Sequence, residues 1–547
     1  MDASNPIPPP SRTAAVARVG RGLALVATLA SCSAEGASRT AKRAADGRRT
    51  AQFDVVGPRV ASPARLTSVL LTEGMSLNVP VTVADDGTVF AGTWGVLRMH
   101  GSDDRRDWEK LDGKVFAFAP DLSPAWSEPF APPRVPYCYD HAGRTDEQRC
   151  PTGGAGSWLS GTVEGRPTLH DESLYVGRGD GVLYALDAST GRERWRARTY
   201  NPADPADPDG GGEVIAEPWV GADGTVYFGS YGVGPYETNA LYAIAPDGTE
   251  RWRYPAQEPS ADTSFLAALA TSPDGSRLYA AGFWRHGGDA TSPFPPSITP
   301  EDGARSSEPG RLFAFDIARG SGTGDERLLW SVELRDSDGW PVGATSLAVA
   351  ADGTLFVGGS SASLGYHAVL LAFRDTGGAA AAAWPRTVSV AGDRAAYAMG
   401  LALREEEGVT TRVYVTSGNN SAVPGGKLLA VSPGDGAVAW SLDPESVGAG
   451  GSVNGVALDR TGVAYVSTRG RDGSGGEVLA VDGEGSVLFT LPLDQPLDLA
   501  RPILGPRGDL YVGGSLRDNP CPLLVPVELG LCPDGPRDPA LYVLSAR

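Results

Sequence analysis

DGVLYALDASTGRERW (residues 180–195) combines a short apolar run, a polar turn and a terminal tryptophan. Residues 182–186 form the apolar run, residues 188–191 have the composition of a turn, and Trp195 ends the unit. Short apolar runs bounded by Gly, Asp and Ser are typical of β-strands joined by tight turns. The stretch is either a cofactor-binding signature or one copy of a structural repeat, and its copies along the chain decide between these.

The stretch is the second half of a longer repeated unit. The first half of that unit recurs eight times, as a polar turn followed by an apolar run that contains an aromatic residue. The aromatic residues of the eight copies are Phe90, Tyr175, Tyr227, Tyr279, Phe356, Tyr414, Tyr465 and Tyr511. The second half recurs as KVFAF, VLYALD, LYAIA, LFAFD, LLAFR, LLAVS, VLAVD and LYVLS. A turn and a tryptophan follow in the first six copies, at Trp126, Trp195, Trp252, Trp330, Trp384 and Trp440. Phe489 takes that place in the seventh copy, and the eighth copy ends at Arg547.

The repeats predict an all-β, eight-bladed propeller of four-stranded antiparallel blades over residues 65–547. Tyr465 and Tyr511 are 46 residues apart, which fits the ~40–50 residues of a propeller blade. The 72 glycines and 44 prolines also favour many short strands with turns over long helices. The eighth copy lacks a last strand, so we expect the N-terminal part of the chain to supply it. Residues 52–56 and 66–71 are the two candidates, and the second is favoured.

The spacing of Ala185, Asp187, Gly191 and Trp195 is A-x-D-x₃-G-x₃-W. This resembles the tryptophan-docking repeat of the pyrroloquinoline-quinone (PQQ) propeller family, and residues 430–440 keep the spacing with Ser432 in place of the aspartate. In physical terms, Asp and Gly favour the hairpin turn. The tryptophan can cover the seam between blades and bury on the order of 200 Å². Every position of the motif therefore has a structural use, and the motif is specific for fold rather than for chemistry.

Two branches of that family carry different expectations. Quinoprotein dehydrogenases oxidise alcohols or sugars with PQQ and calcium, and their sites typically contain a pair of adjacent cysteines. This sequence has no adjacent cysteines and no C-x-x-C-H haem attachment motif. The other branch is non-enzymatic and includes the outer-membrane assembly lipoprotein, a lipid-anchored eight-bladed propeller that binds partner proteins. The N-terminal features favour this second branch, for which no cofactor is expected.

The N-terminal residues 1–31 are expected to be a lipoprotein signal peptide. Arg12, Arg18 and Arg21 precede the apolar stretch GLALVATLA, which is too short to span a bilayer as a mature helix. The sequence LASC, ending at Cys32, resembles the lipobox of bacterial lipoproteins and implies acylation of Cys32. An ordinary signal peptide with an incidental cysteine is the alternative. Residues 32–64 are small and basic, and are predicted to be a flexible tether.

The other four cysteines form two local pairs, which predict disulfides Cys138–Cys150 and Cys521–Cys532. Loops bracketed in this way are common in oxidising compartments, and no C-x₂₋₄-C spacing for zinc occurs. The longest insertions fall at residues 94–112, 127–164, 284–309 and 516–538, and we expect them on one face of the ring. Aromatic residues in these insertions are the candidate partner-binding residues: Trp94, Trp108, Tyr137, Tyr139, Trp158 and Trp284.

No motif in the sequence carries specific catalytic chemistry. The five histidines have no metal-ligand spacing, and residues 204–213 lack the register of a calcium loop. The net charge of −19 argues against a nucleic-acid partner, because nucleic-acid binders usually present a basic face. The sequence therefore predicts a monomeric propeller, anchored by lipid in the bacterial cell envelope, that binds an envelope protein or polysaccharide. A PQQ-dependent dehydrogenase and a carbohydrate-binding propeller are the alternatives.

Overall fold

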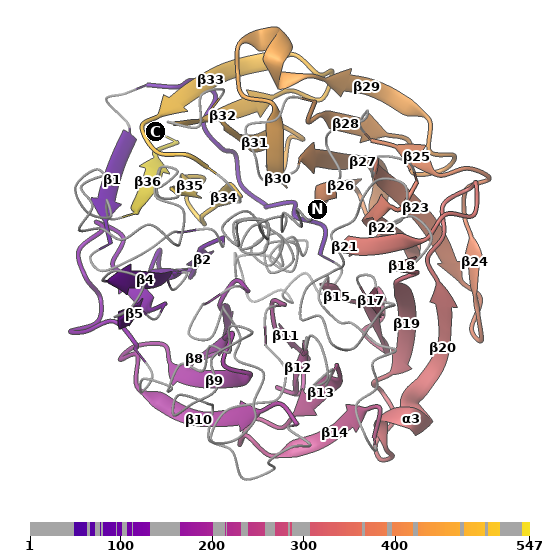
Figure 1. Cartoon of the computed structure of the whole chain (residues 1–547). Coiled ribbons are helices and arrows are strands. Elements are labelled where there is room, and N and C mark those ends of the chain that lie inside the picture. Colours follow the sequence, from indigo (N-terminus) through magenta and orange to yellow (C-terminus); the bar gives the residue numbers. More distant parts are fainter. Residues whose placement is uncertain are drawn as a thin grey trace, which may run out of the picture.

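A computed structural model of the chain contains eight small sheets arranged in a ring (Figure 1). It describes residues 49–546 except 63–65, 72–76, 78–79, 94–95, 101–106, 112, 132–162, 164, 201–213, 215, 231–238, 257–267, 283–284, 287–306, 364–366, 391–396, 419–424, 471–474, 498–500 and 515–538. The predicted eight-bladed all-β propeller is confirmed. None of the helices in the described part of the chain is long and apolar enough to span a membrane.

Each blade is an antiparallel sheet, and in blades one to seven the strands follow the chain from the axis of the ring outward. The strands of blades one to four are β2 (Thr82–Val83), β3 (Val89–Gly92) and β6 (Val115–Phe118); β7 (Thr168–His170), β8 (Ser173–Gly177), β9 (Val182–Asp187) and β10 (Glu193–Arg198); β11 (Trp219–Val220), β12 (Val226–Gly229), β13 (Leu241–Ile244) and β14 (Glu250–Tyr254); and β15 (Ala268–Thr271), β16 (Arg277–Ala281), β19 (Arg311–Asp316) and β20 (Leu328–Glu333).

Blades five to eight follow the same plan, with one short helix after blade six. Their strands are β21 (Val342–Val349), β22 (Thr354–Ser361), β23 (His367–Asp375), β24 (Ala380–Ala382) and β25 (Val388–Ser389); β26 (Tyr397–Glu406), β27 (Val409–Gly418), β28 (Leu428–Val431) and β29 (Val438–Leu442); β30 (Ser452–Leu458), β31 (Ala464–Arg469), β32 (Gly476–Val481) and β33 (Val487–Leu493); and β34 (Ile503–Leu504), β35 (Leu510–Gly513), β36 (Ala540–Leu544) and β1 (Leu66–Leu70). Within the described residues, the helices are α3 (Gly324–Arg327) in blade four and the 3₁₀ helix η3 (Pro444–Val447).

The ring closes through β1, which is the outermost strand of blade eight. β1 pairs antiparallel with β36, in a register that places Leu66 opposite Leu544 and Leu70 opposite Ala540. The predicted closure by residues 66–71 is confirmed. Closure of this kind leaves no unpaired edge on β36, and exposed edges are otherwise prone to aggregate.

Blade one departs from the four-stranded expectation in the described part of the chain. Its outer strand is reduced to two isolated bridges, Phe118 with Pro124 and Val115 with Phe130. Pro124 and Pro129 cause this, because proline has no N–H to donate to a ladder. Pro385 divides the outer strand of blade five in the same way, into β24 and β25, which both pair with β23.

Because the strands are antiparallel, the connections between them lie alternately on two opposite faces of the ring. Turns between the first and second strands, such as residues 459–463 of blade seven, lie on what we call the first-turn face. Connections between the second and third strands lie on the opposite face, which we call the loop face. Two additional hairpins are inserted there: β4 (Val96–His100) with β5 (Asp107–Leu111) in blade one, and β17 (Arg285–His286) with β18 (Ser307–Glu308) in blade four.

Candidate functional site

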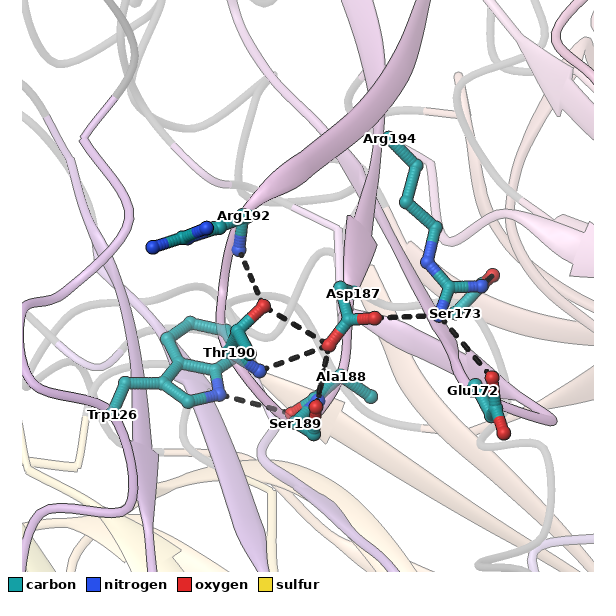
Figure 2. A network of polar contacts seen from close by, with 9 residues as sticks. All are labelled: Trp126, Glu172, Ser173, Asp187, Ala188, Ser189, Thr190, Arg192 and Arg194. Carbon is teal, nitrogen blue, oxygen red and sulfur yellow. Dashed lines mark hydrogen bonds and ion pairs between the residues drawn. The ribbon is translucent and has the colours of Figure 1, made fainter.

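The motif of residues 180–195 is a docking site for the tryptophan of the preceding blade (Figure 2). Trp126 of blade one lies against the turn between β9 and β10, and its Nε1–H donates to the carbonyl of Ala188 over 2.9 Å. Gly191 in that turn has a φ of +71°, and a Cβ added there would lie 2.6 Å from Cε3 of Trp126. The glycine is therefore needed twice, for the left-handed backbone and for the space that the indole occupies.

Asp187 organises the same turn by accepting hydrogen bonds from its neighbours. Its carboxylate accepts from the backbone N–H groups of Ser189 and Thr190, each over 3.0 Å, and forms a 2.6 Å ion pair with Arg194 (Figure 2). The hydrogen bond from Arg194, assisted by those from Ser189 and Thr190, holds the pKa of Asp187 well below its usual range. Asp187 is thus a turn residue that is charged at neutral pH, and its polar contacts in Figure 2 hold the turn.

The same dock recurs at four further seams of the ring. The indole N–H groups donate to the next blade as follows: Trp195 to the Pro246 carbonyl (2.8 Å), Trp330 to Asp375 Oδ1 (3.0 Å), Trp384 to the Pro433 carbonyl (3.0 Å) and Trp440 to the Gly483 carbonyl (2.9 Å). Each dock reaches forward by one blade. The predicted structural role of these tryptophans at the seams agrees with this geometry.

The two seams that flank blade eight are built differently. Blade eight has no turn between its third and fourth strands, because β1 comes from the other end of the chain, and Phe489 stands where a docking tryptophan would lie. At the seam between blades eight and one, Leu122 occupies the turn position that Gly248 has in blade three. Leu122 keeps a positive φ of +66° and packs on the core cluster that blades seven, eight and one share. Apolar packing by Phe489 and Leu122 replaces the tryptophan docks at these seams.

Gly191→Ala should lower the free energy of unfolding by about 2–4 kcal/mol, since the left-handed backbone and the overlap with Trp126 both oppose a Cβ. Gly353→Ala is the matched control, because Gly353 has a φ of +85° but nothing within 4 Å of the added Cβ. The control should cost only the backbone term of about 1–2 kcal/mol. Chemical denaturation of both variants measures the difference, and equal losses would contradict the dock.

The axis of the ring contains a second polar cluster, which the sequence reasoning missed. Glu217 lies directly before β11 and forms ion pairs with Arg49 over 2.5 Å and with Arg166, directly before β7, over 3.2 Å. Arg501 lies before β34, close enough to influence Arg49 electrostatically. All four side chains are buried. Burial is the largest influence on Arg49 and lowers the pKa of its guanidinium, while Glu217 opposes that shift.

Three of these residues share one place in the repeat, and the sequence contained the signal for them. Arg166, Glu217 and Arg501 each precede a proline at the start of the innermost strand of their blades. A charged residue at the same repeat position in three blades must converge on the axis, because all innermost strands surround it. This position precedes the polar turn and the aromatic residue by which the eight copies are recognised.

The N-terminal part of the described chain fills this axis (Figure 1). Arg49 contacts Glu217 of blade three and donates from Nε to the carbonyl of Leu269 in blade four. The Thr50 carbonyl accepts from Leu403 of blade six over 2.7 Å, and the Ala51 carbonyl accepts from Leu458 of blade seven over 2.9 Å. Three consecutive residues therefore touch the innermost strands of four blades. Residues 49–61 were part of the predicted tether.

The axial residues do not fit the PQQ and calcium of the dehydrogenase branch in this arrangement. Arg49 and Thr50 lie at the axis, bonded to the surrounding blades, and the adjacent cysteines of that branch are missing from the sequence. Among the described residues, no group of three or more His, Cys, Asp or Glu side chains is placed to hold a metal ion. We derive no chemical step through either group.

Most of the candidate partner-binding residues cannot be placed. Trp94, Tyr137, Tyr139, Trp158 and Trp284 lie outside the described residues, as do Cys32 and the four cysteines of the predicted disulfides. Trp108 lies on β5, opposite Met99 of β4, so its backbone belongs to the hairpin on the loop face. These predictions of binding, lipidation and disulfide pairing stay predictions.

Comparison with known proteins agrees with the repeat. A family model described as outer membrane protein assembly factor BamB matches residues 112–365. No curated protein sequence matches significantly. A quinohemoprotein alcohol dehydrogenase from Comamonas testosteroni is similar in structure, with 14% identity, a TM-score of 0.57, and coverage of 96% of this chain and 84% of that one.

Two further solved structures are among the matches. A europium-containing methanol dehydrogenase matches with 14% identity, a TM-score of 0.54, and coverage of 91% and 96% of the two chains. BamB from Moraxella catarrhalis matches with 14% identity, a TM-score of 0.48, and coverage of 88% of this chain and 98% of that one. The predicted resemblance to the PQQ-like repeat propellers is confirmed, whereas similarity at this level of identity shows the fold alone.

Proposed function

We propose that this chain, a β-propeller of the PQQ-like repeat type, is a non-enzymatic scaffold that binds a protein or polysaccharide of the bacterial cell envelope. The observation that carries the proposal is the placement of the two inserted hairpins. β4–β5 of blade one and β17–β18 of blade four both extend the connection between the second and third strands. They therefore lie on the loop face, mounted on a rigid ring, which is the usual arrangement for binding loops.

The use of the repeat residues supports a scaffold over an enzyme. Residues 187–194 hold a turn and receive a tryptophan, and the axial carboxylate of Glu217 binds two guanidinium groups. A catalytic site needs polar groups that face a substrate. The polar groups described in these two clusters instead face one another.

The cell envelope follows from the N-terminal sequence as part of the same proposal. The LASC sequence at Cys32 supplies a lipid attachment point, and more than one acyl chain is needed for stable anchoring. Cys32→Ser should move the protein from the membrane fraction to the soluble fraction of cells. Unchanged membrane association of that variant would contradict the lipid anchor. It would not bear on the scaffold proposal, which has a separate test.

Photo-crosslinking in the native cell tests the scaffold directly. A photoreactive amino acid at Trp108, on the loop-face hairpin, should give a discrete crosslinked product, and protease or glycosidase digestion then identifies its class. Glu407 is the control position, because it is exposed in the turn between β26 and β27 on the first-turn face. Equal products from both positions would contradict a loop-face partner. Stoichiometric retention of PQQ after incubation with PQQ and calcium would contradict the non-enzymatic reading.

A further inference from the structure

Residues 49–59 contact the ring in the way that a peptide ligand contacts its receptor, with Arg49 and Ala51 in the left-handed backbone region (φ of +57° and +52°). Their main chain makes four hydrogen bonds with blades six and seven: Leu403 N–H to Thr50 O (2.7 Å), Leu458 N–H to Ala51 O (2.9 Å), Phe53 N–H to Leu458 O (2.8 Å) and Arg460 N–H to Val55 O (2.9 Å). The side-chain amide of Gln52 also binds both backbone groups of Glu405, accepting over 2.6 Å and donating over 3.3 Å. Main-chain pairing of this kind provides affinity in peptide recognition.

Arg49, at the axial end of this segment, makes the side-chain contacts that give the interaction its specificity. Its guanidinium binds the Glu217 carboxylate over 2.5 Å, the Glu217 carbonyl over 3.2 Å and the Leu269 carbonyl. Only 1% of Arg49 is exposed. A planar guanidinium can satisfy three acceptors in different directions, which neither an ammonium nor an amide does equally well.

The other end of the segment is held on the first-turn face of blade seven. The Gly57 N–H donates to Asp459 Oδ2 over 3.1 Å, and Arg59 forms a 2.7 Å ion pair with the same carboxylate. The Tyr465 hydroxyl donates to the Pro58 carbonyl over 3.0 Å. A Cβ at Gly57 would lie 2.4 Å from the Tyr465 hydroxyl oxygen, so this position accepts only glycine without a shift.

The segment lies outside the eight repeats, and the ring is complete without it. Blade eight receives its last strand from β1, which begins at Leu66, after the segment has ended. The contacts of residues 49–59 are therefore added to a closed propeller. Receptor and ligand are adjacent in one chain but belong to separate parts of the structure.

We propose that the axis and the first-turn face of this propeller form a peptide-binding site, and that residues 49–59 occupy it as a ligand in cis. The ligand class is a peptide with an arginine at the axial end and a phenylalanine four residues later, the places that Arg49 and the buried Phe53 take here. Glu217 recognises the arginine, and the edges of the innermost strands of blades six and seven recognise the main chain. This site is independent of the partner proposed for the loop face.

Nicking the full-length protein tests whether the segment is a separable ligand. A specific protease site placed between Ala61 and Leu66 allows cleavage after folding, so that fragment 1–61 is held only by its contacts. The nicked protein should retain the fragment during gel filtration. It should exchange the fragment for an excess of labelled synthetic peptide of residues 48–60. Immediate loss of the fragment, or no exchange at any peptide concentration, would overturn the proposal.

Variants in the segment test the role assigned to Arg49. Arg49→Ala in the peptide should weaken its binding to the nicked protein at least tenfold. Asp54→Ala is the matched control, since Asp54 lies in the same segment but is exposed, and it should bind like the native peptide. Because these changes are made in the peptide, the folding of the ring is not at risk. Equal affinities of the Arg49→Ala and Asp54→Ala peptides would overturn the recognition of arginine.

Discussion

Glu217→Ala should lower the free energy of unfolding by about 3–5 kcal/mol, the usual cost of removing one partner from a buried ion pair. The substitution takes the carboxylate away from two buried guanidinium groups, those of Arg49 and Arg166. Charged groups in a protein interior lose their hydration, and only a counter-charge or hydrogen bonds offset that loss. Thermal and chemical denaturation with the wild type as reference measure the effect.

A second substitution separates the ion pair from general damage to the axis. The double variant Arg49→Ala/Glu217→Ala should be more stable than Glu217→Ala alone, because one of the two buried cations has gone with the carboxylate. Residues in direct contact are expected to show such non-additive effects. Additive losses in the double variant would mean that Arg49 and Glu217 are not coupled, and would contradict the axial cluster described above.

Removal of residues 1–71 should have the other large effect, a loss of about 5 kcal/mol or more of unfolding free energy together with association of the protein. The truncation removes β1 and two almost fully buried side chains, Phe53 and Leu71, each of which stabilises by about 1.5–3 kcal/mol when buried. It also leaves β36 as an open edge, and open edges pair with other chains. Denaturation and light scattering report the two consequences.

The matched control for this truncation is removal of residues 1–48 only. That chain keeps Arg49, the axial contacts and β1. Its unfolding free energy should equal that of the full chain within a few tenths of a kcal/mol. A large loss in the control, or a soluble and equally stable protein without residues 1–71, would contradict closure of the ring by β1.

The repeat allowed much of the fold to be predicted because its residues act locally. Asp187 and Gly191 form a turn whatever lies around them, and the short apolar run of residues 182–186 between turn residues specifies a strand. The number of blades followed from counting, and the missing strand of the last blade indicated that the N-terminal part closes the ring. Phe489 in blade seven and Leu122 in blade one both depart from the repeat. Because these blades flank blade eight, the two departures could have identified it as the blade that closes the ring.

The candidate sites were less predictable, because they depend on residues far apart in the chain. Arg49 and Glu217 are 168 residues apart, and Gln52 and Glu405 are 353 residues apart. No local pattern indicates that these residues meet. The one sequence signal for the axis is the shared position of Arg166, Glu217 and Arg501 before the innermost strands of their blades. Arg49 lies outside the repeats and carries no such signal.

The sequence by itself determined the architecture of this protein: eight blades, the tryptophan seams and an N-terminal strand that closes the ring. These depend on short-range turn chemistry and on strand alternation, which every copy of the repeat carries. The tertiary structure alone decided that a segment before the first blade enters the axis and binds a buried carboxylate. That arrangement exists only when the ring has brought the innermost strands together, because blades three, four, six and seven all contribute contacts to it.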